Sequence, residues 1–193
     1  IEGRYSRTRP ILTPRFIPSC TDALMKELSK LQRRYGLPVQ SHLSESRGEI
    51  AWVRELCPNA ESYGAAYHSF GLLGGPACPT IMAHCVYSEG EEAALLKEQN
   101  VLIAHCPASN ANLASGIAPV RRFLRDGLRV GLGSDVAGGT HTSIFRAMAD
   151  AIQVSKLRWR LADQSLEPLT VSEAFYLGTL GGGAFFGKVG SFA

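Results

Sequence analysis

Five short apolar runs, each ending in a polar residue, recur along the chain and alternate with segments of helical spacing. The runs show no polar alternation and several are rich in β-branched residues, which is typical of strands buried on both faces. Strands that alternate with helices predict an α/β fold with a parallel sheet. The runs cover residues 11–15, 37–42, 80–84, 101–105 and 130–135.

Apolar spacing and capping residues predict the helices between these runs. Ser88 with Glu91, and Thr170 with Glu173, have the spacing of capping boxes. The stretch 58–79 holds four Gly and three Pro, so we expect a surface loop there. The predicted helices cover 21–35, 46–56, 88–99, 117–125 and 142–160, and a further one begins at 170.

Composition narrows the class of protein. Apolar residues make up 45% of the 193 residues and charged residues 19%, which excludes disorder. A net charge of +3 with scattered arginines argues against nucleic-acid binding, and no apolar run approaches the roughly 18 residues of a membrane span. Five cysteines without CxxC spacing predict reduced, mostly buried thiols in a cytoplasmic (cytosolic) protein.

The polar residues that end the runs are candidates for a functional site. Ligands of parallel α/β folds bind at the carboxyl ends of the strands. Three of the five histidines occupy this kind of position, whereas His68 and His141 lie in loop sequence. We expect His68 at the surface and His141 at most on a pocket rim. The run-ending residues are Arg15, His42, His84, His105 and Asp135.

Imidazole and carboxylate groups in this pattern indicate metal chemistry. His42 and Asp135 are suitable ligands for zinc or iron(II). Glu45, three residues after His42, either carries the proton of a metal-bound water or is a first-turn acid of the next helix. His84 either hydrogen-bonds the same water or packs in the core.

Arg15 offers a fork of donors to a carbonyl or carboxylate group. Phe16 beside it offers a ring face, or else belongs to the core. The sequence has no serine nucleophile elbow, phosphate-binding loop or dinucleotide-binding motif. A nucleophilic pair of Cys106 with His105 is unfavourable, because adjacent strand residues point to opposite faces.

Four motifs together resemble the strand-end motifs of the metal-dependent amidohydrolase superfamily. They are QSHLSE at 40–45, MAH at 82–84, AHCPASN at 104–110 and GLGSD at 131–135. They are similar to the ATZ/TRZ-type branch of purine and triazine deaminases and chlorohydrolases. TPRF at 13–16 and DVAGG at 135–139 narrow the resemblance to members that deaminate guanine.

The resemblance implies a TIM-like (β/α)8 barrel with one catalytic metal, usually Zn²⁺, with iron as the other candidate. His42 and Asp135 would be metal ligands. His84 would orient and polarise the metal-bound water, and Glu45 would be the proton shuttle. His105 would have no proton-transfer role. The implied substrate-binding set is Arg15 on the purine carbonyl oxygen, Phe16 against the ring, and His42, Glu45 and Asp135.

The implied reaction is hydrolytic deamination of guanine to xanthine and ammonia, a step of purine catabolism. The partner would be a small purine, and the whole protein would form a homodimer. Two alternatives stay open. One is another heterocycle aminohydrolase or chlorohydrolase of the superfamily, of the 8-oxoguanine or triazine type. The other is a non-catalytic, degenerate relative.

One departure from the family pattern concerns the missing ligands. The family takes two more metal ligands from an HxH motif on its first strand, and this sequence contains no HxH. Residues 190–193 also fall short of the family's final strand segment. We therefore expect residues 1–193 to be a partial barrel domain covering strands four to eight. The alternative is a relative that has lost the first half.

Overall fold

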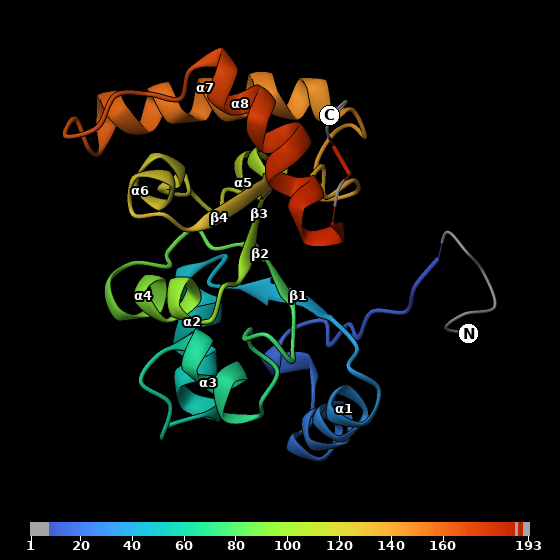
Figure 1. The fold of residues 1–193 in the computed structure, drawn as a ribbon. Coiled ribbons are helices and arrows are strands. Elements are labelled where there is room, and N and C mark those ends of the chain that lie inside the picture. The colour runs from blue at the N-terminus through green and yellow to red at the C-terminus, as the bar shows by residue number, and fades with distance from the viewer. Residues whose placement is uncertain (1–7, 188, 191–193) are drawn as a thin grey trace.

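A parallel sheet of four strands, in the order β1–β2–β3–β4, forms the centre of the fold (Figure 1). The computed structural model describes residues 8–187, 189 and 190. The prediction of an α/β fold with a parallel sheet is confirmed. The prediction for residues 191–193 lies outside the described residues. The strands are β1 (Val39–Leu43), β2 (Thr80–His84), β3 (Leu102–His105) and β4 (Arg129–Leu132).

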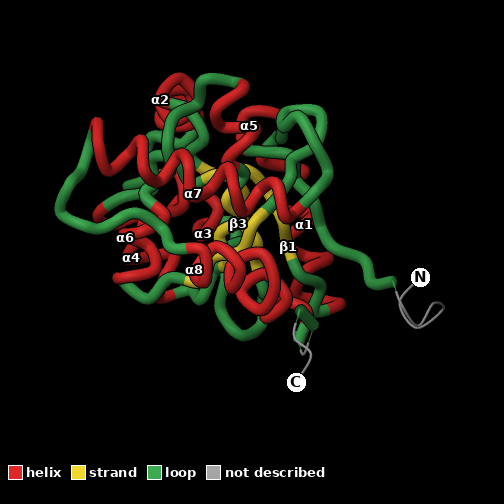
Figure 2. The backbone as a smooth tube through the Cα atoms, turned by 90° about the horizontal axis from the view of Figure 1, so that it is seen from above, coloured by secondary structure: helices red, strands yellow, loops and turns green. Residues whose placement is uncertain are grey.

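Helices surround the strands, as the view from above shows (Figure 2). Local signals explain their ends: the Thr21 hydroxyl caps the first helix, Gly36 ends it in the left-handed conformation, and Thr170 with Glu173 forms the predicted capping box. The α-helices are α1 (Asp22–Tyr35), α2 (Arg47–Leu56), α3 (Tyr63–Ser69), α4 (Gly90–Glu98), α5 (Pro107–Asn112), α6 (Val120–Arg125), α7 (Ile144–Leu161) and α8 (Val171–Tyr176). Shorter helical turns are η1 (Ile17–Ser19), η2 (Leu177–Gly181) and η3 (Ala184–Phe186).

The first apolar run, 11–15, does not form the full strand that its composition predicts. Leu12 makes a single parallel bridge to Val39 at the open side of β1. Pro14 has no N–H group to continue the ladder. The run still places Arg15 beside the end of β1, because the Arg15 carbonyl oxygen accepts from the His42 N–H.

The Gly- and Pro-rich stretch 58–79 is not the surface loop that we expected, since it contains α3. The Ser62 hydroxyl caps this helix, and the apolar spacing of its residues turns one face inward. Tyr63 and Tyr67 are buried, with their rings stacked at a centroid distance of 5.5 Å. The stretch therefore contributes to the core.

Two further expectations are wrong in detail. We expected strands buried on both faces. In β1 one face, with Val39 and Leu43, is buried, whereas the other face, with His42, is only half-buried. Ser88 does not cap α4, whose N-cap is Glu89 without a side-chain hydrogen bond. The Ser88 hydroxyl instead donates to the buried Glu92 carboxylate at 2.6 Å.

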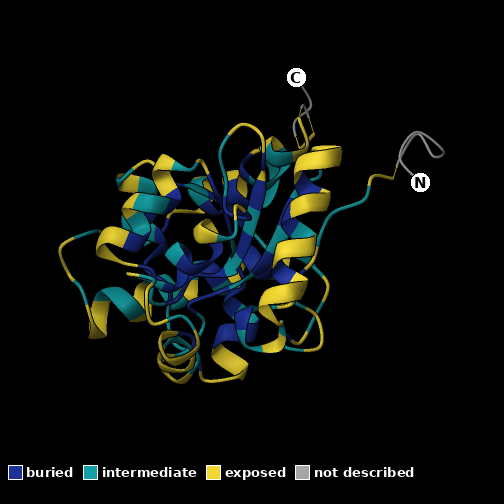
Figure 3. Cartoon of the chain, turned by 90° about the horizontal axis from the view of Figure 1, so that it is seen from below, coloured by how far each residue is buried: buried dark blue, intermediate teal, exposed yellow. Residues whose placement is uncertain are grey.

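The core lies between the sheet and the inner faces of the helices, while the outer helix faces are exposed (Figure 3). In the part of the chain that the structure describes, no helix combines the length and apolarity that crossing a membrane requires. Cys78, Cys85 and Cys106 are buried, and Cys20 and Cys57 are half-buried, so the prediction of mostly buried cysteines is confirmed.

Candidate functional site

Polar side chains from the carboxyl ends of the strands surround a cavity of about 220 Å³. The six residues that the sequence singles out as catalytic, substrate-binding or metal-ligating all lie on its wall. Parallel strands end at the same edge of a sheet, which explains how residues so far apart in sequence come together. The wall consists of Arg15, Phe16, His42, Glu45, Glu49, His84, Leu113, Asp135 and Gly138.

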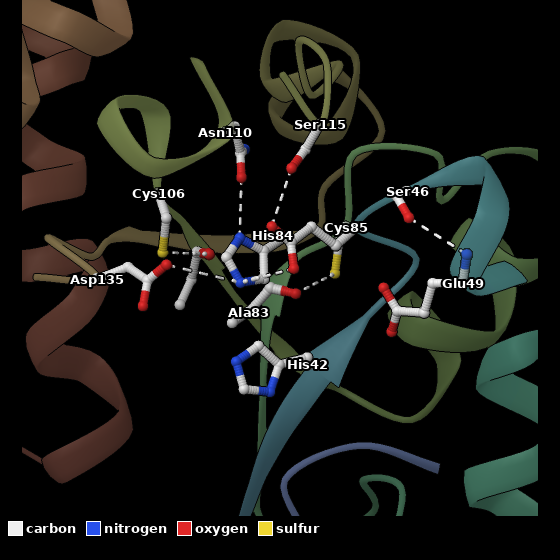
Figure 4. Close-up of polar contacts among 12 residues, drawn as sticks. His42, Ser46, Glu49, Ala83, His84, Cys85, Cys106, Asn110, Ser115 and Asp135 are labelled. Carbon is white, nitrogen blue, oxygen red and sulfur yellow. Dashed lines mark hydrogen bonds and ion pairs between the residues drawn. The ribbon is translucent and has the colours of Figure 1, made fainter. Parts of the chain in front are cut away.

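His84 lies at the centre of the polar contacts (Figure 4). The residue is 1% exposed, and its Nδ1 lies 2.8 Å from the Asn110 amide oxygen. Its Nε2 lies 3.7 Å from Glu45 Oε2 and 4.0 Å from Asp135 Oδ2. The imidazole therefore presents one nitrogen to two carboxylates, an arrangement that can pass protons to and from a small molecule held between them.

Glu45 lies in the turn between β1 and α2. Ser46 is the N-cap of α2 and Glu49 is its first-turn acid, so the interpretation of Glu45 as a first-turn acid is wrong. The Ser115 hydroxyl donates to Glu45 Oε1 at 2.9 Å. One oxygen of Glu45 is thus held, and the other faces His84.

His42 stacks on His84, with ring centroids 5.4 Å apart and an interplanar angle of 13°. Its Nδ1 lies 2.5 Å from the Arg15 carbonyl oxygen. Because this contact occupies Nδ1, Nε2 is the nitrogen that can bind a ligand.

Arg15 and Phe16 form the part of the wall next to His42. The Arg15 side chain is exposed, and its guanidinium carbon lies 5.2 Å from the centroid of the Phe16 ring. Phe16 is half-buried and makes edge contacts with His42 and Trp52. A planar, polar ring could contact both an aromatic surface and a donor fork here.

The sequence did not single out Glu49 and Ser115, and it gave no individual role to Asn110. Glu49 lines the cavity, and its Oε1 accepts from the Tyr63 hydroxyl at 2.6 Å. Burial raises the pKa of Glu49, and this hydrogen bond opposes the rise. Nothing in the local sequence marks these three residues, because their partners lie 14 to 70 residues away.

Three histidines lie away from the cavity. His105 is buried and faces a separate small space beside α6 and α7. His68 is exposed, as expected, although it lies on α3. His141 is bonded through Nε2 to the Asp150 carboxylate at 2.7 Å. None of the three lines the cavity wall within the described residues.

His105 should make stability depend on pH. Burial, with a further effect of nearby His84, lowers the pKa of His105 from 6.5 to about 3. Below pH 6.5 the unfolded chain binds a proton at this residue that the folded chain does not. The contribution of neutral His105 to the free energy of unfolding is therefore complete above pH 6.5 and is lost as the pH falls toward 3. Between these pH values we expect the free energy of unfolding to fall by about 1.4 kcal/mol per pH unit from this residue, as measured by urea denaturation. His105→Asn, which does not titrate, should show a shallower dependence, and equal slopes would contradict the prediction.

The backbone is strained where the strands meet the cavity. Ser44, His84 and Asp135 have φ angles of 46°, 71° and 44°, in the left-handed region that non-glycine residues seldom adopt. Residues held this way cluster at functional sites. Two of these three residues, His84 and Asp135, are the ones whose side chains face each other across 4.0 Å.

His42 and Asp135 are the two predicted metal ligands, and both line the cavity. Over residues 8–187, 189 and 190, no group of three or more His, Cys, Asp or Glu side chains could hold a metal ion. The structure thus provides two donors of the type that zinc and iron(II) prefer, fewer than the three or four of a complete zinc site.

Comparisons with known proteins agree on one family. The model of the amidohydrolase family matches residues 4–193. A guanine deaminase of Dictyostelium discoideum is 47% identical over 174 residues, which cover 90% of this chain and 38% of that protein. A guanine deaminase of Homo sapiens is 38% identical over 195 residues, covering the whole of this chain and 42% of that protein.

A solved structure of a guanine deaminase is also similar to this chain. The crystal structure of a guanine deaminase from C. acetobutylicum with guanine bound in the active site superposes with a TM-score of 0.92 at 52% identity. The match covers 96% of this chain and 44% of that one. This chain thus spans about two fifths of the length of the relatives that it matches.

Proposed function

The chain belongs to the amidohydrolase family, and on that premise we propose that its cavity deaminates guanine to xanthine and ammonia. One observation carries the proposal: His84 Nε2 faces both Glu45 and Asp135 in a cavity that Arg15 and Phe16 also line. The similarity to guanine deaminases, one of which holds guanine, supports this choice of substrate. We also propose that the segment 11–15 and the strands β1 to β4 correspond to strands four to eight of a TIM-like (β/α)8 barrel.

Substrate binding is assigned to the exposed part of the wall. The Arg15 guanidinium would donate to the carbonyl oxygen of guanine, a contact that suits its fork of N–H groups. The Phe16 ring would pack against the purine. The two side chains would orient the carbon that bears the amino group toward Glu45 and His84.

His42 Nε2 and the Asp135 carboxylate would hold the metal ion. Imidazole and carboxylate donors fit Zn²⁺ or Fe²⁺. When bound, the ion supplies a Lewis acid that lowers the pKa of water toward about 7. Both proposed ligands lie close to His84: the His42 ring stacks on it, and the Asp135 carboxylate is 4.0 Å from its Nε2.

Proton transfer is assigned to three side chains. Water adds its oxygen to the amino-bearing carbon, and Glu45 moves a proton to the adjacent ring nitrogen. Asp135 accepts the remaining proton of the water and passes it to the amino group. The carbon–nitrogen bond then breaks, and the amino group leaves as ammonia. His84 Nε2 hydrogen-bonds the attacking oxygen and orients it. The sum is guanine plus water giving xanthine plus ammonia.

A substrate panel tests the proposal on the whole natural protein that contains these 193 residues. With Zn²⁺ present, we expect ammonia release and xanthine formation from guanine, and much slower turnover of 8-oxoguanine and triazines. Treatment with a chelator should abolish activity, and added Zn²⁺ should restore it. Turnover of a triazine but not of guanine would support the alternative within the family. No turnover of any compound would favour a non-catalytic protein.

A further inference from the structure

The segment that follows β3 contacts the residues of the cavity wall at three points, and Figure 4 shows its Asn110 and Ser115 on the side of His84. It consists of α5 and the turn up to Ser115. Each contact joins this segment to a different part of the wall, namely the end of β2, the turn after β1 and the loop after β4. The pairs are Asn110 with His84 at 2.8 Å, Ser115 with Glu45 at 2.9 Å and Asn112 with the Gly138 carbonyl oxygen at 2.8 Å.

Asn110 is fixed within this segment. The residue is 2% exposed. Its N–H donates to the Cys106 carbonyl oxygen at 3.0 Å, and its own carbonyl oxygen accepts from the Ser115 N–H at 2.9 Å. The Asn110 side chain therefore presents its amide oxygen to His84 from a rigid backbone.

The chemistry of this contact determines where the imidazole carries its hydrogen. An amide oxygen accepts hydrogen bonds but has no hydrogen to donate. The hydrogen between Asn110 Oδ1 and His84 Nδ1 must then belong to Nδ1. Nε2 is left as the nitrogen that faces Glu45 and Asp135.

We propose that Asn110 is a positioning residue that fixes both the orientation and the tautomer of His84. It acts through His84 and lies outside the cavity wall. Its importance for catalysis rests on the role proposed above for His84. Its effect on the imidazole rests on the contact alone and can be measured without turnover.

Nitrogen NMR of ¹⁵N-histidine-labelled protein at neutral pH tests this directly. We expect Nδ1 of His84 to carry a hydrogen in the wild type and in Asn110→Asp, which keeps the acceptor. In Asn110→Leu, which has a similar size but no acceptor, the hydrogen should move to Nε2. His84→Gln identifies the signals, and circular dichroism verifies that each variant is folded.

The NMR experiment has a matched control and two results that would contradict the proposed role of Asn110. Asn59→Leu, at an exposed position outside the cavity wall, should leave the His84 signals unchanged. A wild-type Nδ1 without hydrogen would mean that Asn110 presents its NH₂ group, and would overturn the proposal. An unchanged tautomer in folded Asn110→Leu would overturn it as well.

Kinetics give a second readout. In Asn110→Leu we expect kcat to fall about tenfold, the effect of one lost hydrogen bond on the transition state, with KM unchanged within about twofold. Asn110→Asp should restore kcat. A KM effect alone would contradict the positioning role. If the wild type does not deaminate guanine, the proposed function fails, while the NMR result still decides the role of Asn110.

Discussion

Replacing Glu45 with glutamine is expected to lower kcat for guanine about 10²–10⁴-fold, the contribution of a positioned general acid–base. The amide keeps the size of the side chain and can still accept from Ser115, which lies 2.9 Å from Oε1 in the wild type. It cannot take up and release a proton. KM should therefore change little, and steady-state formation of xanthine measures both constants.

The control for this variant is Glu61→Gln, an exposed glutamate outside the cavity wall. It removes the same charge and should leave kcat unchanged. A Glu45→Gln protein that keeps more than a tenth of the wild-type kcat would show that the proton moves through another group.

Replacing Glu92 with alanine is expected to destabilise the fold by about 3–5 kcal/mol, the cost of stranding several buried donors at once. Glu92 is 7% exposed and accepts from three groups. The hydroxyls of Ser44 and Ser88 donate to Oε1 at 2.7 and 2.6 Å, and the Gly64 N–H donates to Oε2 at 2.8 Å. One carboxylate thus joins the turn after β1, the start of α3 and the approach to α4.

Urea denaturation followed by tryptophan fluorescence measures the loss. Glu91→Ala provides the matched control, because Glu91 is the exposed neighbour that the sequence pattern pairs with Ser88. It should cost less than about 0.5 kcal/mol, as surface substitutions usually do. A loss below about 1 kcal/mol in Glu92→Ala would show that solvent takes over these hydrogen bonds.

The sequence predicts most of what depends on local pattern. Apolar runs and caps locate four strands and the longer helices within a few residues. The parallel arrangement then brings His42, His84 and Asp135 to one edge, as the general rule for such sheets requires. Whether these residues have the proposed roles stays a prediction, which the kinetic and NMR experiments above address.

The errors have specific physical causes. Pro14 stops a ladder that the apolar run 11–15 would otherwise continue. The four glycines and three prolines of 58–79 hide the spacing of Tyr63 and Tyr67, which turns them inward on α3. Ser88 has two acids within reach, at Glu91 and Glu92, and only tertiary packing decides that it bonds the buried one.

The hydrogen bonds that orient the cavity residues cannot be predicted from the local sequence. Asn110 is 26 residues from His84, and Ser115 is 70 residues from Glu45. No periodicity or capping rule relates such positions, because only the packing of α5 across the end of the sheet brings them together.

The left-handed backbone at His84 and Asp135 has an evolutionary consequence. Such conformations cost about 1–3 kcal/mol each, and glycine or asparagine would relieve much of that cost. At Asp135, whose side chain is 34% exposed, selection for heat resistance alone would therefore favour replacing a residue to which we assign chemistry. At the buried His84 the cavity left by a smaller side chain would offset the gain. A thermostability screen without an activity filter should enrich inactive proteins at position 135, so directed evolution of this chain needs selection for both properties at once.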